Sequence, residues 1–185
     1  MSGTELLAEL GIAADYGSTP YRPAFTEATE LTDVEPNPLG TMQRLAPETA
    51  AAWHAMKTSA ADAGVRLLIV SGFRSIRHQA DLIRRKLAAG QLIEAILKVN
   101  AAPGFSEHHT GRAIDIATPG TRPLTAEFAS TSAFAWLATN AGTFGFRMPY
   151  GPNNRYGFEY EPWHWSQVAE PPVGDYQGAR DRRRQ

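Results

Sequence analysis

The sequence predicts a single α+β domain of 185 residues. Four segments repeat apolar residues at helical spacing, and a few shorter segments carry the apolar patterns of β-strands. A hydrophobic fraction of 43% with 20% charged residues is typical of a globular chain with one buried core. Because the length suits one domain of ordinary size, we expect no division into two domains.

The first 45 residues are expected to wrap around this domain as mostly irregular structure. One short amphipathic stretch contains Leu6, Leu7 and Leu10, and prolines recur after it. Proline fixes φ and removes a backbone donor, so it interrupts regular elements. We therefore predict an N-terminal wrapping segment (1–45) that belongs to the same domain as the motif-bearing residues 46–168.

The next two elements are predicted to be a helix and a buried strand. Segment 46–64 has proline near its start, good helix formers within it and glycine at its end, with Trp53 and Met56 on one face. The run 65–70 (VRLLIV) is apolar, rich in branched residues and of strand length. This strand would deliver Arg74 at its far end.

Two helices follow. Ser75 can accept a backbone hydrogen bond at the start of a helix over 76–89, which has an apolar stripe that includes Ile83. Gly90 is placed to end that helix. The segment 91–100 (QLIEAILKVN) predicts a second, shorter helix.

The last third of the chain predicts one helix and three short strands. Residues 112–117 alternate in strand fashion, which places Asp115 on a face with two alanines. Segment 132–142 has the pattern of a capped helix that ends at glycine. Short strands are expected around 145–150 and 163–168.

Composition excludes several classes of function. A formal net charge of −1 provides no general attraction for nucleic acid. No apolar run approaches the roughly 20 residues that cross a bilayer, and the start of the chain lacks the basic and apolar regions of an export signal. The absence of cysteine excludes disulfides and thiolate ligands. The tail 169–185, with proline, glycine and a basic cluster, is expected to be flexible.

Three separated segments each carry reactive polar side chains: SGFRS (71–75), SEHHTGRAID (106–115) and EPWHW (161–165). A catalytic zinc ion takes three protein ligands from histidine and carboxylate and leaves one position for water. His108, Asp115 and His164 supply that set. The sequence therefore predicts a hydrolytic metal site built from the second and third segments.

The same segments contain the other groups that such a site needs. Glu161 can act as a base for water, and Arg74 can stabilise a developing oxyanion. Glu161 lies three residues before His164, so their Cα atoms are at most about 11 Å apart. Gly111 allows backbone conformations closed to other residues, so the chain can turn and aim His108 and Asp115 at one point.

The other three histidines fit no ligand position. His109 is adjacent to His108 and is expected to support the site or to border the cleft. His54 and His78 fall within helical patterns and are expected to be surface or packing residues.

With SGFRS upstream and EPWH downstream, the pattern S-x-H-x-x-G-x-A-x-D resembles the zinc D-alanyl-D-alanine carboxypeptidases of the VanY type. Those enzymes share a fold with VanX dipeptidases, phage L-alanyl-D-glutamate endopeptidases and the hedgehog signalling domain. The resemblance implies a small antiparallel sheet that bears the zinc site, with helices packed around it. It covers roughly residues 64–167.

Matched position by position, the resemblance implies a role for each motif residue. His108, Asp115 and His164 would bind Zn²⁺, Glu161 would be the general base and Arg74 would polarise the scissile carbonyl. Ser106 and Gln79 match positions expected to hold the terminal carboxylate of the substrate. Trp163 is expected to contact the substrate from the cleft wall.

The function expected from the residues and the resemblance is hydrolysis of the D-alanyl-D-alanine bond of peptidoglycan stem peptides by a monomeric enzyme. Three alternatives remain open: an L-alanyl-D-glutamate or other peptidoglycan endopeptidase (a lysin or toxin), a non-haem iron oxygenase, and a non-catalytic hedgehog-like binding module. An oxygenase is disfavoured because six residues separate His108 from Asp115 and Glu161 would be idle.

A cell-wall substrate implies action in the periplasm or outside the cell, although the sequence contains no export signal. A chain from which an export signal has been removed, or delivery as a phage enzyme or secreted toxin, would remove this conflict. A cytoplasmic enzyme that acts on free dipeptides is a further alternative.

Overall fold

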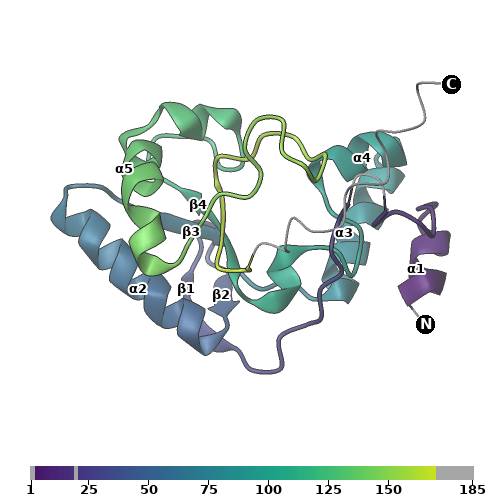
Figure 1. Cartoon of the computed structure of the whole chain (residues 1–185), viewed down its shortest axis with the longest axis horizontal. Coiled ribbons are helices and arrows are strands. Elements are labelled where there is room, and N and C mark those ends of the chain that lie inside the picture. The colour runs from purple at the N-terminus through teal and green to yellow at the C-terminus, as the bar shows by residue number, and fades with distance from the viewer. Residues whose placement is uncertain (1–2, 19–20, 170–185) are drawn as a thin grey trace, which may run out of the picture.

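An antiparallel sheet of three short strands lies at the centre of the computed structural model, which describes residues 3–18 and 21–169 (Figure 1). The predicted tail 169–185 falls, apart from Ala169, outside these residues. The α-helices are α1 (Gly3–Glu9), α2 (Pro47–Asp62), α3 (Ile76–Ala88), α4 (Ile93–Val99) and α5 (Ser132–Asn140). The strands are β1 (Thr32–Pro36), β2 (Met42–Leu45), β3 (Leu68–Ser71), β4 (Ala113–Ala117) and β5 (His164–Ser166). The short 3₁₀ helices are η1 (Glu107–Thr110), η2 (Ala126–Ser130) and η3 (Ala141–Phe144).

The central sheet has the order β3-β4-β5, with every residue of β4 buried. Asp115 lies opposite Ser71 on β3 and opposite His164 on β5. The alternating pattern turns Ile114 and Ile116 away from Asp115 and into the core. The predicted α+β domain with a small antiparallel sheet is therefore confirmed.

Two apolar cores flank this sheet. The first joins the sheet to α2 and α5, on the left of Figure 1, and includes Trp53, Met56 and Leu137. The second joins α1, α3 and α4, on the right, and includes Ile83 and Ile96. In the described part of the chain, no helix has the length and apolar character required to cross a membrane.

Side chains cap two of the helices. The Ser75 hydroxyl accepts a hydrogen bond from the His78 backbone N–H at 3.0 Å, so the predicted cap of α3 is confirmed. Thr131 accepts from the Phe134 N–H at 3.1 Å at the start of α5. The predicted helix over 132–142 is present, although its last turns are the 3₁₀ helix η3.

The expectation of irregular structure in the first 45 residues is wrong for residues 32–45, where β1 and β2 form an antiparallel hairpin. The prolines do not prevent this hairpin: Pro36 is the last residue of β1 and precedes the turn. Asn37 closes the turn, because its side-chain oxygen accepts from the backbone N–H groups of Leu39 and Thr41, both at 3.0 Å.

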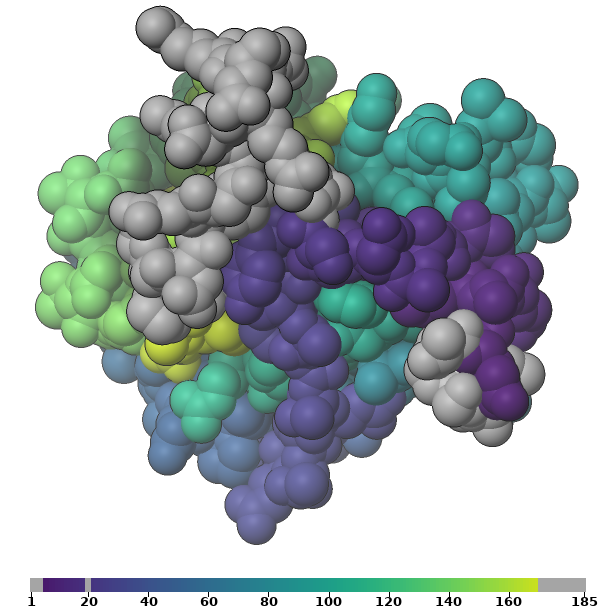
Figure 2. All heavy atoms as spheres, turned by 45° about the vertical axis from the view of Figure 1, so that its right-hand side comes forward, coloured from purple at the N-terminus to yellow at the C-terminus, as the bar shows by residue number. Residues whose placement is uncertain are grey.

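The described residues between α1 and β1 form neither helix nor strand and run across the surface, as Figure 2 shows in purple to indigo. Two backbone hydrogen bonds attach this segment to the chain around η1: Phe25 N–H donates to Gly104 O and Ala28 N–H to His109 O. The N-terminal segment therefore packs directly against the turn that carries the histidine pair.

One predicted strand is absent. Residues 145–150 form only an isolated bridge between Arg147 and Ser166, although β5 itself lies within the predicted strand 163–168. Pro149 has no N–H group to continue the pairing beyond this bridge.

Gly111 ends η1 in the left-handed region, at φ 65°. A Cβ atom built at this position would lie 2.9 Å from the backbone nitrogen of Ala46. The predicted turn at Gly111 is thus confirmed, and it depends on close contact with the start of α2 as well as on the backbone angle.

We expect Gly111→Ala to lower the free energy of unfolding by roughly 2–4 kcal/mol, from left-handed strain together with the Ala46 clash. Gly120→Ala is the matched control, because Gly120 has φ 87° but nothing within 4 Å of its built Cβ. The control should lose only about 1 kcal/mol. Denaturant titration measures both, and equal losses would contradict this account.

Candidate metal centre and active-site cavity

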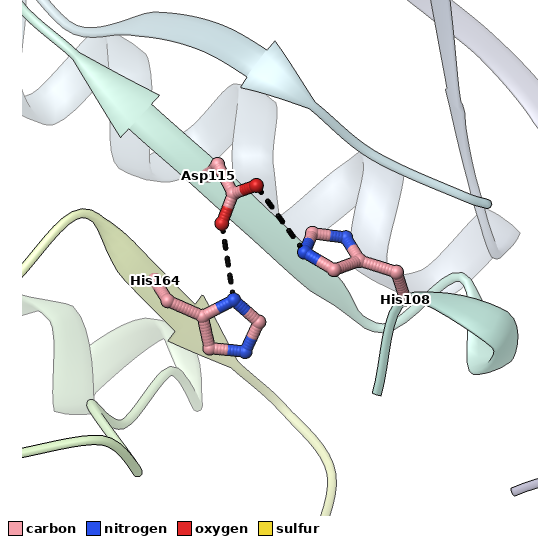
Figure 3. Close-up of side chains that lie close together, drawn as sticks. All are labelled: His108, Asp115 and His164. Carbon is pink, nitrogen blue, oxygen red and sulfur yellow. Dashed lines mark hydrogen bonds and ion pairs between the residues drawn. The ribbon is translucent and has the colours of Figure 1, made fainter. Parts of the chain in front are cut away.

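His108, Asp115 and His164 lie close together, with their potential ligand atoms all within 4.8 Å of one another (Figure 3). Each comes from a different element: η1, β4 and β5. Asp115 Oδ2 lies 3.3 Å from His108 Nε2, and Asp115 Oδ1 lies 3.0 Å from His164 Nδ1. The three predicted ligand residues are therefore brought together, with all three side chains buried.

The orientation of His108 follows from a backbone contact. Its Nδ1 lies 2.7 Å from the carbonyl oxygen of Gly72, which can only accept, so Nδ1 carries the proton. Nε2 is then the unprotonated nitrogen, and it is the one that faces Asp115. Burial lowers the pKa of His108, which favours this neutral ring.

His164 is oriented the opposite way. Its Nε2 lies 3.0 Å from Glu107 Oε2, while Nδ1 faces Asp115. Tyr150 stacks on the ring of His164, with a centroid distance of 4.7 Å and an interplanar angle of 25°. One histidine thus presents Nε2 to the cluster and the other presents Nδ1.

The electrostatics of the cluster favour a cation at its centre. Burial disfavours a charged His164, but hydrogen bonds to Asp115 and Glu107 outweigh it and raise the pKa of His164 to about 10. Burial also disfavours an ionised Asp115, yet His108 and His164 hold the pKa of Asp115 well below its usual range. The carboxylates of Asp115 and Glu107 therefore favour a positive charge on or beside His164.

The donor spacing also fits a metal ion. Ligand atoms about 2.0–2.2 Å from a four-coordinate zinc lie roughly 3.3 Å apart. The distances from Asp115 Oδ1 to His164 and from Asp115 Oδ2 to His108, at 3.0 and 3.3 Å, are close to that separation, and one ligand atom from each of the three residues lies within 4.8 Å of the others. Two histidines and one carboxylate are a donor set suited to zinc.

Arg74 follows β3 and lies beside the cluster. Its Nη2 is 3.9 Å from Asp115 Oδ2 and donates to Ser71 Oγ at 3.0 Å, while Nη1 donates to Gln79 Oε1 at 2.9 Å. Its backbone is fixed by η1, since Arg74 N–H donates to His108 O and Arg74 O accepts from His109 Nδ1. Hydrogen bonds of both the backbone and the side chain therefore fix the position of the Arg74 guanidinium group.

A cavity of about 590 Å³ opens over the cluster. Its wall includes the predicted residues Arg74, Ser106, Glu161 and Trp163 as well as the three candidate ligands. Glu161 is buried, and burial raises the pKa of Glu161 to about 8. The cavity therefore combines a buried carboxyl group, a cation and a candidate metal site.

One predicted residue, Gln79, lies elsewhere than expected. Gln79 is 0% exposed and does not line the cavity; its Oε1 accepts from Arg74 and its Nε2 donates to Ala101 O at 2.7 Å. This position behind Arg74 lets Gln79 orient that side chain, and direct substrate contact stays a prediction. His109 is also fully buried and lies outside the metal cluster.

His109 bonds to the backbone through both ring nitrogens. Nδ1 contacts Arg74 O at 2.6 Å, and Nε2 accepts from Gly104 N–H at 3.1 Å. Burial lowers the pKa of His109 to about 4, so the ring stays neutral. The adjacent histidines therefore differ in position: His108 belongs to the candidate metal cluster, whereas His109 lies outside it and contacts the backbone of Arg74.

Sequence reasoning missed four residues of the site: Glu107, Arg147, Tyr150 and Lys86. Glu107 could have been found from the sequence, because it is a carboxylate within the motif, between Ser106 and the candidate ligand His108. Lys86 could also have been considered, because it is a lysine in the predicted helix that follows Arg74. Arg147 and Tyr150 lie outside every motif and gave no signal.

The VanY family, described as D-alanyl-D-alanine carboxypeptidase, matches residues 42–170. The match contains all three motif segments and most of the chain. The chain therefore belongs to the VanY family.

Two curated relatives match in sequence. A putative carboxypeptidase, YodJ, of Bacillus subtilis (strain 168) is 35% identical over 127 residues, which is 66% of this chain and 46% of that protein. A D-alanyl-D-alanine carboxypeptidase of Enterococcus faecalis is 31% identical over 116 residues, 57% of this chain and 41% of that protein. The chain thus spans less than half the length of these relatives.

Solved structures match in fold. The LD-carboxypeptidase LdcB has 33% identity and a TM-score of 0.68, covering 79% of this chain and 72% of its own. A mutant of the D,D-pentapeptidase VanY, from the VanB-type vancomycin resistance cassette, was solved with Zn(II); it has 26% identity and a TM-score of 0.61, covering 80% and 83%. VanYB in complex with D-alanine-D-alanine has 27% identity and a TM-score of 0.62, covering 80% and 82%.

We expect His108→Ala to weaken zinc binding by more than about 100-fold, because loss of a ligand should exceed the cost of losing a supporting contact. His109→Gln is the matched control, since its amide can still donate to Arg74 O and accept from Gly104 N–H. It should keep one zinc ion per chain. Competitive zinc titration and metal analysis measure both variants, and equal losses would refute the assignment.

Proposed function

We propose that this protein is a zinc-dependent carboxypeptidase that removes the terminal D-alanine from peptidoglycan stem peptides. The observation that carries the proposal is the buried His108, Asp115 and His164 cluster at the base of a cavity that also holds Glu161 and Arg74. Such a substrate lies outside the cytoplasm, so we place its action in the periplasm or outside the cell.

Zinc is the proposed metal because the donor set and spacing suit it and because a VanY relative was solved with Zn(II). When bound, zinc would supply Lewis acidity, which lowers the pKa of water and polarises a carbonyl group. His108 would bind through Nε2, His164 through Nδ1 and Asp115 through its carboxylate.

Glu161 and Arg74 would carry the remaining steps. Glu161 would take a proton from the attacking water and return it to the leaving amine. Its burial favours the protonated form, as suits a group that must hold that proton between the two transfers. Arg74 would stabilise negative charge on the oxygen of the scissile carbonyl, from a position fixed by Gln79 and Ser71.

The charges in the cavity support recognition of a free peptide terminus. Arg74 and Lys86 both line it, and the Lys86 amino group donates to the amide oxygen of Asn100. Burial, together with the nearby charge of Arg74, lowers the pKa of Lys86. A terminal carboxylate would offset this repulsion, with Ser106 close by in the cavity wall. An enzyme that cuts inside a peptide would also need Arg74 to stabilise the carbonyl oxygen, but it would have no terminal carboxylate to pair with Lys86.

The residue before the cleaved bond could be D-alanine, which defines D,D specificity, or an L-configured residue, which defines L,D specificity. D,D specificity is the first candidate, since VanYB was solved with D-alanine-D-alanine and the family is described by that bond. L,D specificity is the second, because LdcB shares more identity and a higher TM-score with this chain than VanY does. Both candidates release terminal D-alanine.

Digestion of defined stem peptides tests the proposal. We expect free D-alanine from a pentapeptide ending in D-alanyl-D-alanine, abolished by a chelator and restored by zinc, with products identified by mass spectrometry. Release from the tetrapeptide alone would favour the L,D candidate. Cleavage inside the stem would favour an endopeptidase. A folded, zinc-loaded protein that cleaves neither peptide would overturn the proposal in favour of a binding module.

We expect Glu161→Gln to lower kcat by roughly 10²–10⁴-fold, because a general base is lost, while zinc content is unchanged. Glu159→Gln is the matched control: Glu159 lines the same cavity but is exposed. It should keep most of its activity. Steady-state kinetics and metal analysis decide, and a zinc-loaded, fully active Glu161→Gln variant would exclude Glu161 as the base.

A further inference from the structure

The buried carboxylate of Glu107 contacts a candidate metal ligand without belonging to the metal cluster. Its Oε2 lies 3.0 Å from His164 Nε2, and its side chain is only 4% exposed. The other nitrogen of the same ring, Nδ1, lies 3.0 Å from Asp115 Oδ1. His164 is therefore held between two carboxylates, one on the metal side and one behind it.

The position of Glu107 determines which nitrogen of His164 can bind a metal. A metal ligand needs an unprotonated nitrogen, and a neutral imidazole has one protonated and one unprotonated nitrogen. An ionised carboxylate can only accept, so Glu107 requires the proton on Nε2. A metal ion could then replace only the proton on Nδ1, the nitrogen that faces Asp115.

Arg147 neutralises the buried charge of Glu107. Its Nη2 lies 3.0 Å from Glu107 Oε1, the carboxylate oxygen that does not face His164. Arg147 is fixed to the chain around β5, because it forms the backbone bridge with Ser166 and its Nε donates to Val168 O at 2.9 Å. One carboxylate thus joins η1, which carries His108, to the strand that carries His164.

We propose that Glu107, held by Arg147, is a positioning residue that fixes the Nε2–H tautomer of His164 and thereby sets the metal affinity of the site. The tautomer of His108 is fixed in the same way by the backbone carbonyl of Gly72, which accepts a hydrogen bond from Nδ1. A carboxylate is a stronger acceptor than a carbonyl and makes the ring a better donor to metal. The proposal rests on His164 as a metal ligand in the proposed function, and it is independent of the peptide bond cleaved.

Glu107→Gln tests the proposal, because the amide has nearly the same shape but no charge, and its NH₂ group can donate to Nε2 and favour the opposite tautomer. We expect zinc affinity to fall about 10–100-fold, as for other partners of metal ligands. Glu48→Gln is the matched control: Glu48 also pairs with an arginine at 3.0 Å, that of Arg112, but its side chain is 78% exposed. The control should bind zinc as the wild type does.

A second measurement needs no variant. In the zinc-loaded wild type, long-range proton–nitrogen NMR correlations of the histidine rings should show the His164 proton on Nε2 and the His108 proton on Nδ1. A His164 proton on Nδ1, or zinc affinity of Glu107→Gln equal to wild type, would overturn the proposal. Neither readout uses a substrate, so a failure of the proposed peptidase activity would leave them interpretable.

Discussion

The pairing register around Asp115 governs the geometry of the site. Asp115 on the central strand lies opposite Ser71 and His164, so its carboxylate lies against both candidate histidine ligands and 3.9 Å from Arg74 Nη2. A slip of one residue would turn Asp115 into the apolar core and expose Ile114 to the cavity. The register is held because Ile114 and Ile116 are fully buried on the opposite face.

The N-terminal segment contributes to the site although most of it precedes the family match at residue 42. Ala28 N–H donates to the carbonyl of His109, and a Cβ atom built at Gly111, at the end of the same turn, would lie 3.1 Å from Leu31 and 3.5 Å from Ala28. The turn that positions His108 and His109 is therefore enclosed by the wrapping segment and the start of α2. The wrapping segment contains no catalytic motif, but its packing helps to hold this turn in place.

Several buried polar groups of the site have a bonding partner that also sets their direction. Gln79 orients the guanidinium of Arg74, and His109 fixes its backbone. Glu107 and the Gly72 carbonyl set the direction of the two histidine rings. Buried hydrogen bonds of this kind keep a constellation rigid, because a side chain that rotated would leave its partner unsatisfied.

The sequence by itself determined the helices over 46–64 and 76–89, the central strands and the set of residues that meet at the cavity. It could do so because apolar periodicity reflects local geometry, and because metal ligation restricts the residue types at a site. Only the tertiary structure decided the hairpin β1–β2, the position of Gln79 behind Arg74 and the nitrogen that each histidine presents. These features depend on contacts between distant residues: His108 with Gly72 is 36 positions apart and His164 with Glu107 is 57. No pattern along the chain encodes which of two ring nitrogens will face a carboxylate once those segments meet.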